Sequence, residues 1–169
     1  MPKTTKPLVS YAVLSFTLQT ELMEIPLPEA LKHHTSKLAS FTDLQSVQTF
    51  GFRGEALSSL CALAQVSMHT ATQAEAPVGT LLTFDQAGNV TPGSRKQPRQ
   101  RGTTVVVRDL FMGYPVRRRE FEKNLKREFT KVQAVLQAYA LIQKGVRFIV
   151  YNMPKAGGYV IRAPARSLM

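Results

Sequence analysis

The sequence contains little from which a disulfide, a metal site or a membrane span could be built. Its 169 residues include one cysteine and three scattered histidines, which excludes an internal disulfide and leaves no zinc-ligand spacing. Cys61 lies in an apolar stretch, and we expect a buried, unreactive thiol in a reducing compartment. No apolar run reaches the roughly 18 residues that a membrane span needs. Leu8 to Leu18 is too short and too polar for a signal peptide, so we expect an intracellular protein.

Acidic residues are also scarce. The 11 Asp and Glu residues stand against 22 Lys and Arg, which gives a formal net charge of +11. Such a balance favours polyanionic partners such as DNA, RNA or nucleotides, and high solubility is the plainer alternative. The rest of the composition, 44% hydrophobic and 20% charged, is typical of a globular protein, and the length fits one domain.

The positive charge is concentrated between residues 95 and 147. This range holds fourteen Lys or Arg and only four acidic residues. We predict that a basic cluster around a helix start contacts DNA phosphates, and a merely solvated helix face is the alternative. The predicted DNA-contacting residues are Arg117, Arg118, Arg119, Lys123, Lys126 and Arg127.

Hydrophobic patterning predicts both strands and helices. Three segments alternate as half-buried strands do, and a fourth is β-branched throughout. The predicted strands are 66–70, 79–84, 103–107 and 146–151. Between the second and third of these, residues 91–101 are rich in Pro, Gly and Arg and predict an exposed loop. Residues 1–28 carry four prolines and are compatible with one strand or a short helix.

Two helices are predicted, one over 56–63 and a long one from Pro115 to Gly145. Apolar residues recur along the long helix at steps of three and four, which predicts a single core-facing stripe. The stripe consists of Phe121, Leu125, Phe129, Val132, Leu136, Tyr139 and Ile142. Helices alternating with hairpin-like strand pairs predict an α/β two-layer sandwich with a mixed, largely antiparallel sheet.

The segment Gly51 to Leu57 predicts an anion site. Its residues are Gly51, Phe52, Arg53, Gly54, Glu55, Ala56 and Leu57. Two glycines flank an arginine directly before a helix, where unpaired backbone N–H groups point outward and glycine lets a phosphate approach closely. Glycine before a helix is also common in simple turns, so the physical signal alone is moderate.

Two further elements could converge on the same nucleotide. Thr35, Ser36 and Lys37 would supply hydroxyl donors and a point charge, and Thr103 would add a hydroxyl from the predicted strand. Taken singly, a lysine is usually a surface residue and a threonine a strand former. Neither a P-loop string nor a GxGxxG string occurs.

The segment Gly51-Phe52-Arg53-Gly54-Glu55-Ala56-Leu57 resembles the signature of the MutL family of DNA mismatch-repair proteins. Three further strings match the same family. They are Lys32 to Lys37, Arg101-Gly102-Thr103-Thr104-Val105, and Leu110-Phe111 followed by Pro115 to Phe121. The likeness is to the eukaryotic post-meiotic-segregation subunit and covers about residues 29 to 151.

This resemblance implies a GHKL (Bergerat-type) ATPase domain that binds ATP and Mg²⁺ beneath a mobile lid. In such a domain Thr35, Ser36, Lys37 and the Gly51–Leu57 segment would surround the phosphates, and Thr103 would belong to the last nucleotide-binding motif. Lid closure would gate dimerisation. The implied partners are mismatch-containing DNA and a second MutL homologue, as a heterodimer in the nucleus, with no membrane.

The departures from the family pattern are equally specific. The family carries a Glu that acts as general base, an Asn that holds Mg²⁺ and an Asp-x-Gly-x-Gly loop whose Asp reads adenine. No Asp precedes Asp43 here, and Ile25 stands where the Asn is needed after Glu21-Leu22-Met23-Glu24. Losing that oxygen ligand would weaken Mg²⁺ binding. No catalytic residue is therefore assigned, and we expect weak ATP binding and little hydrolysis.

The resulting domain prediction is an unmatched segment 1–28 followed by a partial ATPase domain, 29–169, incomplete at its N-terminus. A truncated or alternatively spliced product and a divergent duplicate are the open explanations. The predicted function is that of a mismatch-repair MutL-family fragment with impaired hydrolysis. The alternatives are a non-enzymatic module that binds DNA or a partner, and a poorly folded, non-functional product.

Overall fold

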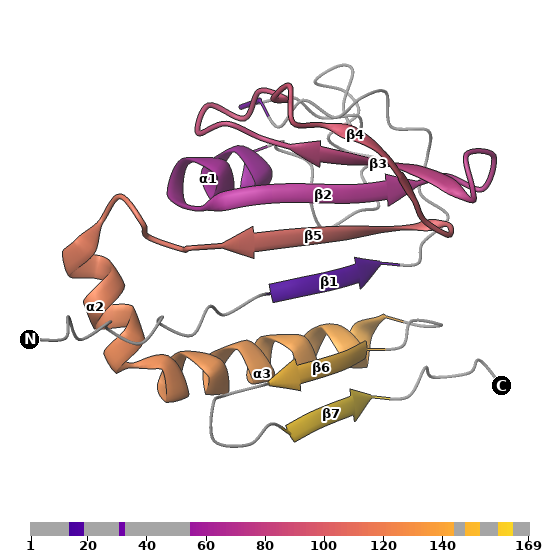
Figure 1. The fold of residues 1–169 in the computed structure, drawn as a ribbon. Helices are drawn as coiled ribbons and strands as arrows, with labels where there is room; N and C mark the ends of the chain where they lie inside the picture. The colour runs from indigo at the N-terminus through magenta and orange to yellow at the C-terminus, as the bar shows by residue number, and fades with distance from the viewer. Residues whose placement is uncertain (1–13, 19–30, 33–54, 144–147, 153–158, 164–169) are drawn as a thin grey trace, which may run out of the picture. The chain divides into compact units, whose positions relative to one another are not determined.

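The computed structural model describes residues 14–18, 31–32, 55–143, 148–152 and 159–163 (Figure 1). The chain divides into two units, one formed by Tyr11–Tyr114 and the other by Met1–Ser10 with Pro115–Met169.

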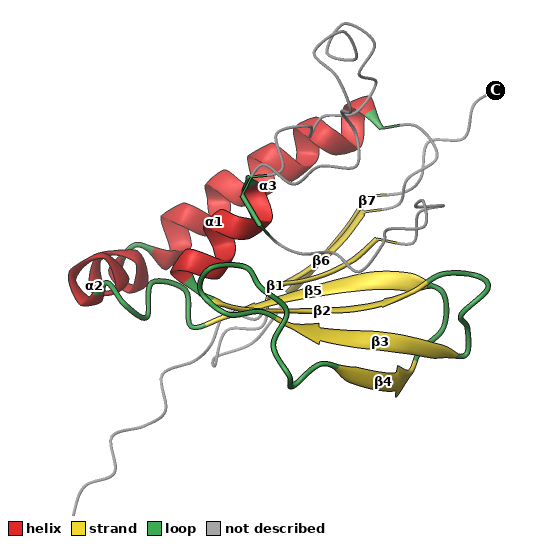
Figure 2. Cartoon of the chain, turned by 90° about the horizontal axis from the view of Figure 1, so that it is seen from above, coloured by secondary structure: helices red, strands yellow, loops and turns green. Residues whose placement is uncertain are grey.

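The first unit is built on a five-stranded antiparallel sheet in the order β1-β5-β2-β3-β4 (Figure 2). Its strands are β1 (Leu14–Leu18), β2 (Gln65–Ala71), β3 (Val78–Thr83), β4 (Arg95–Pro98) and β5 (Gly102–Arg108). The predicted strands at 66–70, 79–84 and 103–107 are confirmed to within one or two residues, as is the largely antiparallel sheet. β-branched and alternating residues therefore sufficed to identify these three strands.

The helix α1 (Ala56–Leu63) packs its apolar residues on one face of this sheet. The core cluster consists of Cys61, Ala64, Val66 and Val107, with Leu57, Leu60, Phe84, Val105 and Leu110 packed against it. Cys61 is 1% exposed, as expected, and its burial raises the pKa of the thiol. Because residues alternate along a strand, Val66 and Val107 fix which side of the sheet carries the core. We call this side the helix face and the opposite side the outer face.

The prediction of a loop over 91–101 was wrong in one respect, because Arg95–Pro98 forms β4 at the edge of the sheet. The sequence Arg-Lys-Gln-Pro has no strand pattern of its own. Its strand geometry comes from pairing with β3, which places Pro98 opposite Val78. An edge strand tolerates proline because one row of its backbone groups needs no partner in the sheet.

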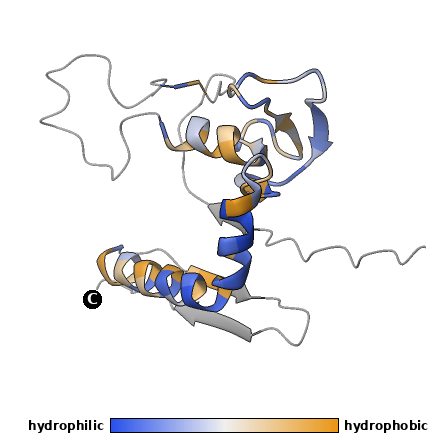
Figure 3. Ribbon diagram, turned by 90° about the vertical axis from the view of Figure 1, so that its left-hand side faces the viewer, coloured by the Kyte–Doolittle hydropathy of each residue, from blue (hydrophilic) through white to orange (hydrophobic). Residues whose placement is uncertain are grey.

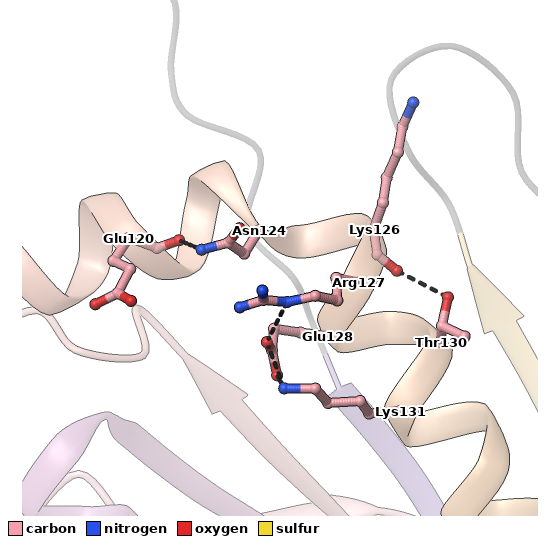
Figure 4. A network of polar contacts seen from close by, with 7 residues as sticks. All are labelled: Glu120, Asn124, Lys126, Arg127, Glu128, Thr130 and Lys131. Atoms are coloured by element: carbon pink, nitrogen blue, oxygen red, sulfur yellow. Dashed lines mark hydrogen bonds and ion pairs between the residues drawn. The ribbon is translucent and has the colours of Figure 1, made fainter.

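The second unit contains α2 (Pro115–Lys123), α3 (Leu125–Ile142) and the antiparallel hairpin of β6 (Phe148–Asn152) and β7 (Tyr159–Ala163). One long helix was predicted, and the structure divides it at Asn124. This residue has φ −103° and ψ 12°, its backbone N–H donates to the carbonyls of Glu120 and Phe121, and its side-chain Nδ2 donates to the Glu120 carbonyl at 3.0 Å (Figure 4). Asparagine competes for backbone hydrogen bonds in this way, which favours helix caps over helix interiors.

The predicted core-facing stripe of the long helix was also wrong within the described part of the unit. No residue of α2 or α3 is buried, and Ile142, the last stripe residue, is 62% exposed. The helix ends there, three residues before Gly145, which lies outside the described residues. Two helices and a two-stranded hairpin offer too little apolar surface to bury such a stripe. None of the described helices has the length and apolar character to cross a membrane.

Candidate nucleotide site and basic surfaces

The described residues include only part of the predicted nucleotide site. Glu55, Ala56, Leu57 and Thr103 are described. Seven predicted residues lie outside the described part of the chain: Thr35, Ser36, Lys37, Gly51, Phe52, Arg53 and Gly54.

The end of the Gly51–Leu57 segment forms the start of α1. Glu55 is the N-cap with φ −109° and ψ −19°, and its carbonyl accepts from the Ser59 backbone N–H at 3.0 Å and from Ser58 Oγ at 2.9 Å. No side chain caps the first turn, and that turn contains no acidic residue. The first backbone N–H groups of a helix have no partner within it, and the helix dipole makes this end positive. Leu57 packs against the core, which anchors this end of α1 to the sheet.

Thr103 lies on the helix face in a row of polar side chains that crosses four strands. Strand register places Thr70 opposite both Thr103 and Thr80, and Thr80 opposite Lys96. The Thr70 and Thr103 hydroxyls are 2.7 Å apart, and Lys96 Nζ donates to the Thr80 hydroxyl at 2.8 Å. Sequence reasoning identified Thr103 but missed the other three, because only cross-strand register brings them together.

The strand next to Thr103 bears no carboxylate. β1 pairs with the free edge of β5, with Leu18 opposite Thr103 and Thr17 opposite Thr104. Residues 14–18 are Leu-Ser-Phe-Thr-Leu and come from the segment that lies outside the family resemblance. Within the described residues, no group of three or more His, Cys, Asp or Glu side chains is arranged to hold a metal ion.

The predicted DNA-contacting residues lie on α2 and at the start of α3. α2 is hydrophilic along most of its length (Figure 3). Ion pairs neutralise part of the charge, since Arg118 Nε lies 3.1 Å from Glu122 and Arg127 Nε 3.5 Å from Glu128. Lys131 binds the same Glu128 at 2.9 Å, and this hydrogen bond is the main reason that the pKa of Glu128 is lowered (Figure 4).

Three of the six predicted residues, Arg119, Lys123 and Lys126, are exposed and make no ion pair with another described residue. Arg119 and Lys123 are four residues apart on α2 and therefore share one side of the helix. The unpaired positive charge is thus concentrated on α2. At the start of α3, Glu128 neutralises part of the positive charge.

Comparisons with known proteins identify the family. No family model matches the chain. The chain is 58% identical over 123 residues to DNA mismatch repair protein PMS1 of Arabidopsis thaliana, a match that covers 73% of this chain and 13% of that protein. The crystal structure of the N-terminal domain of a DNA repair protein matches with a TM-score of 0.66 and 41% identity, covering 82% of this chain and 39% of that one.

A further solved structure is the Aquifex aeolicus MutL ATPase domain complexed with ADP. It is 31% identical, covers 65% of this chain and 42% of that chain, and has a TM-score of 0.49. The chain thus spans well under half the length of each of these proteins. Its sequence and fold show that it belongs to the MutL family of DNA mismatch-repair proteins, as a post-meiotic-segregation-type relative with the fold of the N-terminal GHKL ATPase domain.

Proposed function

We propose that this chain supplies nucleotide-phosphate and DNA contacts of a mismatch-repair subunit but does not hydrolyse ATP efficiently. The proposed setting is the nucleus, where the relatives' role in DNA mismatch repair would require duplex DNA and a second MutL homologue as heterodimer partner. The observation that carries the proposal is the pairing of β1 with β5, which puts Leu18, in a strand without Asp or Glu, opposite Thr103.

The phosphate side of the proposed site rests on the start of α1. The uncapped first turn offers backbone N–H donors and the positive end of the helix dipole, and Leu57 holds it against the core. Thr35, Ser36, Lys37 and Gly51 to Gly54 would complete the contacts to a triphosphate as the family resemblance implies. Mg²⁺ would then be held mainly by the phosphates, since Ile25 replaces its asparagine ligand.

A site with phosphate donors but no base-reading carboxylate would not distinguish nucleobases. We therefore expect ATP, GTP and inorganic tripolyphosphate to bind within about threefold of one another, because a missing hydrogen-bonding group removes most discrimination. Titration of the full chain by calorimetry measures the three affinities. ATP binding more than tenfold tighter than GTP would contradict the absence of an adenine-reading group.

The DNA contacts are proposed for the exposed charges of α2. Changing Arg119 and Lys123 together to Gln should lower the magnitude of the salt slope of duplex binding by about two, since each phosphate contact contributes about 0.9. Fluorescence anisotropy with a labelled 30-base-pair duplex at several salt concentrations measures the slope.

Lys131→Gln is the matched control for this measurement. Its ammonium is already paired with Glu128, so the slope should change little. An unchanged slope in the Arg119/Lys123 double variant would remove α2 from the DNA interface and favour a solvated helix.

A further inference from the structure

The outer face of the five-stranded sheet is polar and basic. Strand register assigns it side chains from all five strands. Among those of β2 to β5, Ala71 is buried and ten others are half-buried or exposed. They are Gln65, Ser67 and His69 of β2, Leu81 and Thr83 of β3, Arg95 and Gln97 of β4, and Thr104, Val106 and Arg108 of β5. None of the ten is acidic.

Arg99 lies over this face, and neighbouring groups fix its position. Its Nε donates to the Gly102 carbonyl at 3.0 Å, and its Nη2 donates to the Thr104 hydroxyl at 2.8 Å. Its backbone N–H donates to the Pro77 carbonyl at 2.8 Å, and its Cβ passes close to Gly79, where a side chain would collide. Burial lowers the pKa of Arg99, but the guanidinium stays charged at neutral pH. Its partners are neutral oxygens, so its charge is available to an anion.

His69 lies in the middle of the same face with an unused polar atom. Its Nε2 is shielded from solvent and makes no hydrogen bond with any described residue. Cross-strand register places His69 opposite Thr104 on one side and opposite Leu81 on the other. Arg99 donates to the Thr104 hydroxyl, and Arg95 lies opposite Leu81 on the next strand. Buried polar atoms without a partner are rare and call for a specific explanation. A ligand oxygen would supply the missing partner once binding moves aside the side chains that shield Nε2 from solvent.

The arginines of this face lie at spacings that suit an extended anion. Arg95 is three strands from Thr104, about 14 Å at 4.7–4.9 Å per strand, and Arg108 is four residues from Thr104, about 13 Å along β5. Arg95 and Arg108 are both exposed and make no ion pair with a described residue. A single phosphate or carboxylate would reach only one of these charges.

We propose that the outer face, with Arg99 and His69 near its centre and Arg95 and Arg108 at its margins, binds the sugar–phosphate backbone of a nucleic acid. Proteins bind a sugar–phosphate backbone through cationic side chains and hydrogen-bond donors spaced along it. This face provides both, and none of the ten side chains is acidic. An acidic protein segment fits less well, because protein interfaces rely on buried aromatic or aliphatic anchors. Leu81 and Val106 are the only apolar side chains larger than alanine that register assigns here.

The decisive comparison is Arg95→Gln against Lys96→Gln in the full chain. The two residues are adjacent on β4, both are exposed, and they point to opposite faces, so each variant removes one charge from nearly the same place. Arg95→Gln should weaken binding of a labelled 30-base-pair duplex about five- to tenfold at 0.1 M salt and reduce the salt slope by about one. Lys96→Gln should leave the slope unchanged. Equal effects of the two variants, or no effect of Arg95→Gln, would overturn the proposal.

Two further measurements exclude other sources of the same effect. The ¹⁵N resonance of His69 Nε2 should shift when duplex is added, and no shift would place the nucleic acid elsewhere. Poly-glutamate should compete weakly at equal charge concentration, whereas competition as strong as that of DNA would assign the face to an acidic protein partner and overturn the proposal. The Arg119/Lys123 variant tests DNA binding by α2 separately. Binding by α2 and binding by the outer face can therefore be confirmed or refuted independently.

Discussion

Leu82→Ala should lower the free energy of unfolding by about 2–5 kcal/mol, the range for truncating a buried leucine. Leu82 is 1% exposed and lies on β3 opposite Met68, which is 9% exposed. The variant removes apolar contacts and leaves a cavity. The backbone cannot move to fill this cavity, because β3 is paired with β2 on one side and with β4 on the other. Urea unfolding followed by circular dichroism gives the change, with an unaltered denaturant slope expected.

Val78→Ala is the matched control on the same strand and face. Val78 is 47% exposed, so its truncation should cost about 1 kcal/mol or less. A loss in Leu82→Ala no larger than that of Val78→Ala would mean that the helix face does not form a packed core. A cooperative transition in the wild-type chain would in turn argue against a poorly folded product.

Gly79→Ala should destabilise the first unit by about 1–3 kcal/mol, the usual cost of forcing an extra group into a packed site. A Cβ at this position would lie 2.6 Å from the Thr70 carbonyl oxygen and 3.1 Å from the Arg99 Cβ. The first of these atoms is backbone within β2, so β3 must move away from it. The shift would also displace Arg99 from its contacts with Gly102 and Thr104.

Gly113→Ala provides the comparison, because nothing lies within 4 Å of an added Cβ there. The variant should be neutral or gain about 0.4–1 kcal/mol from the reduced freedom of the unfolded chain. Thermal and urea unfolding of both variants measure the difference. Equal stability of the two would show that the Thr70 carbonyl and Arg99 do not approach Gly79 as closely as described.

Much of the sheet was predictable from the sequence because its strands carry their own signal. The β-branched run ending at Val107 and the alternation beginning at Val66 are local patterns, and both became strands. β4 carries no such pattern and exists because β3 offers it a pairing edge. The helix break at Asn124 was not predicted, because the apolar periodicity continues through this residue. The asparagine itself was a signal for a break, since its side chain competes for backbone hydrogen bonds inside a helix.

The sequence indicated candidate-site residues only where a motif is continuous along the chain. The Gly51–Leu57 string gave the family and the start of α1. The row from Thr103 to Lys96 and the grouping of Arg99 with His69 depend on register between strands far apart in the chain, which single residues do not encode. β1, the strand that pairs with β5 at the edge of the sheet, lies in a segment with no recognisable motif.

We propose that this chain keeps the phosphate-binding side of a GHKL site but lacks the groups that read adenine and activate water. Steady-state phosphate release by the full chain with Mg²⁺ and ATP tests it most directly. We expect release at the background rate, unchanged by Glu24→Ala. Release well above background that Glu24→Ala abolishes would contradict it, because a general base would then have survived in residues 1–28.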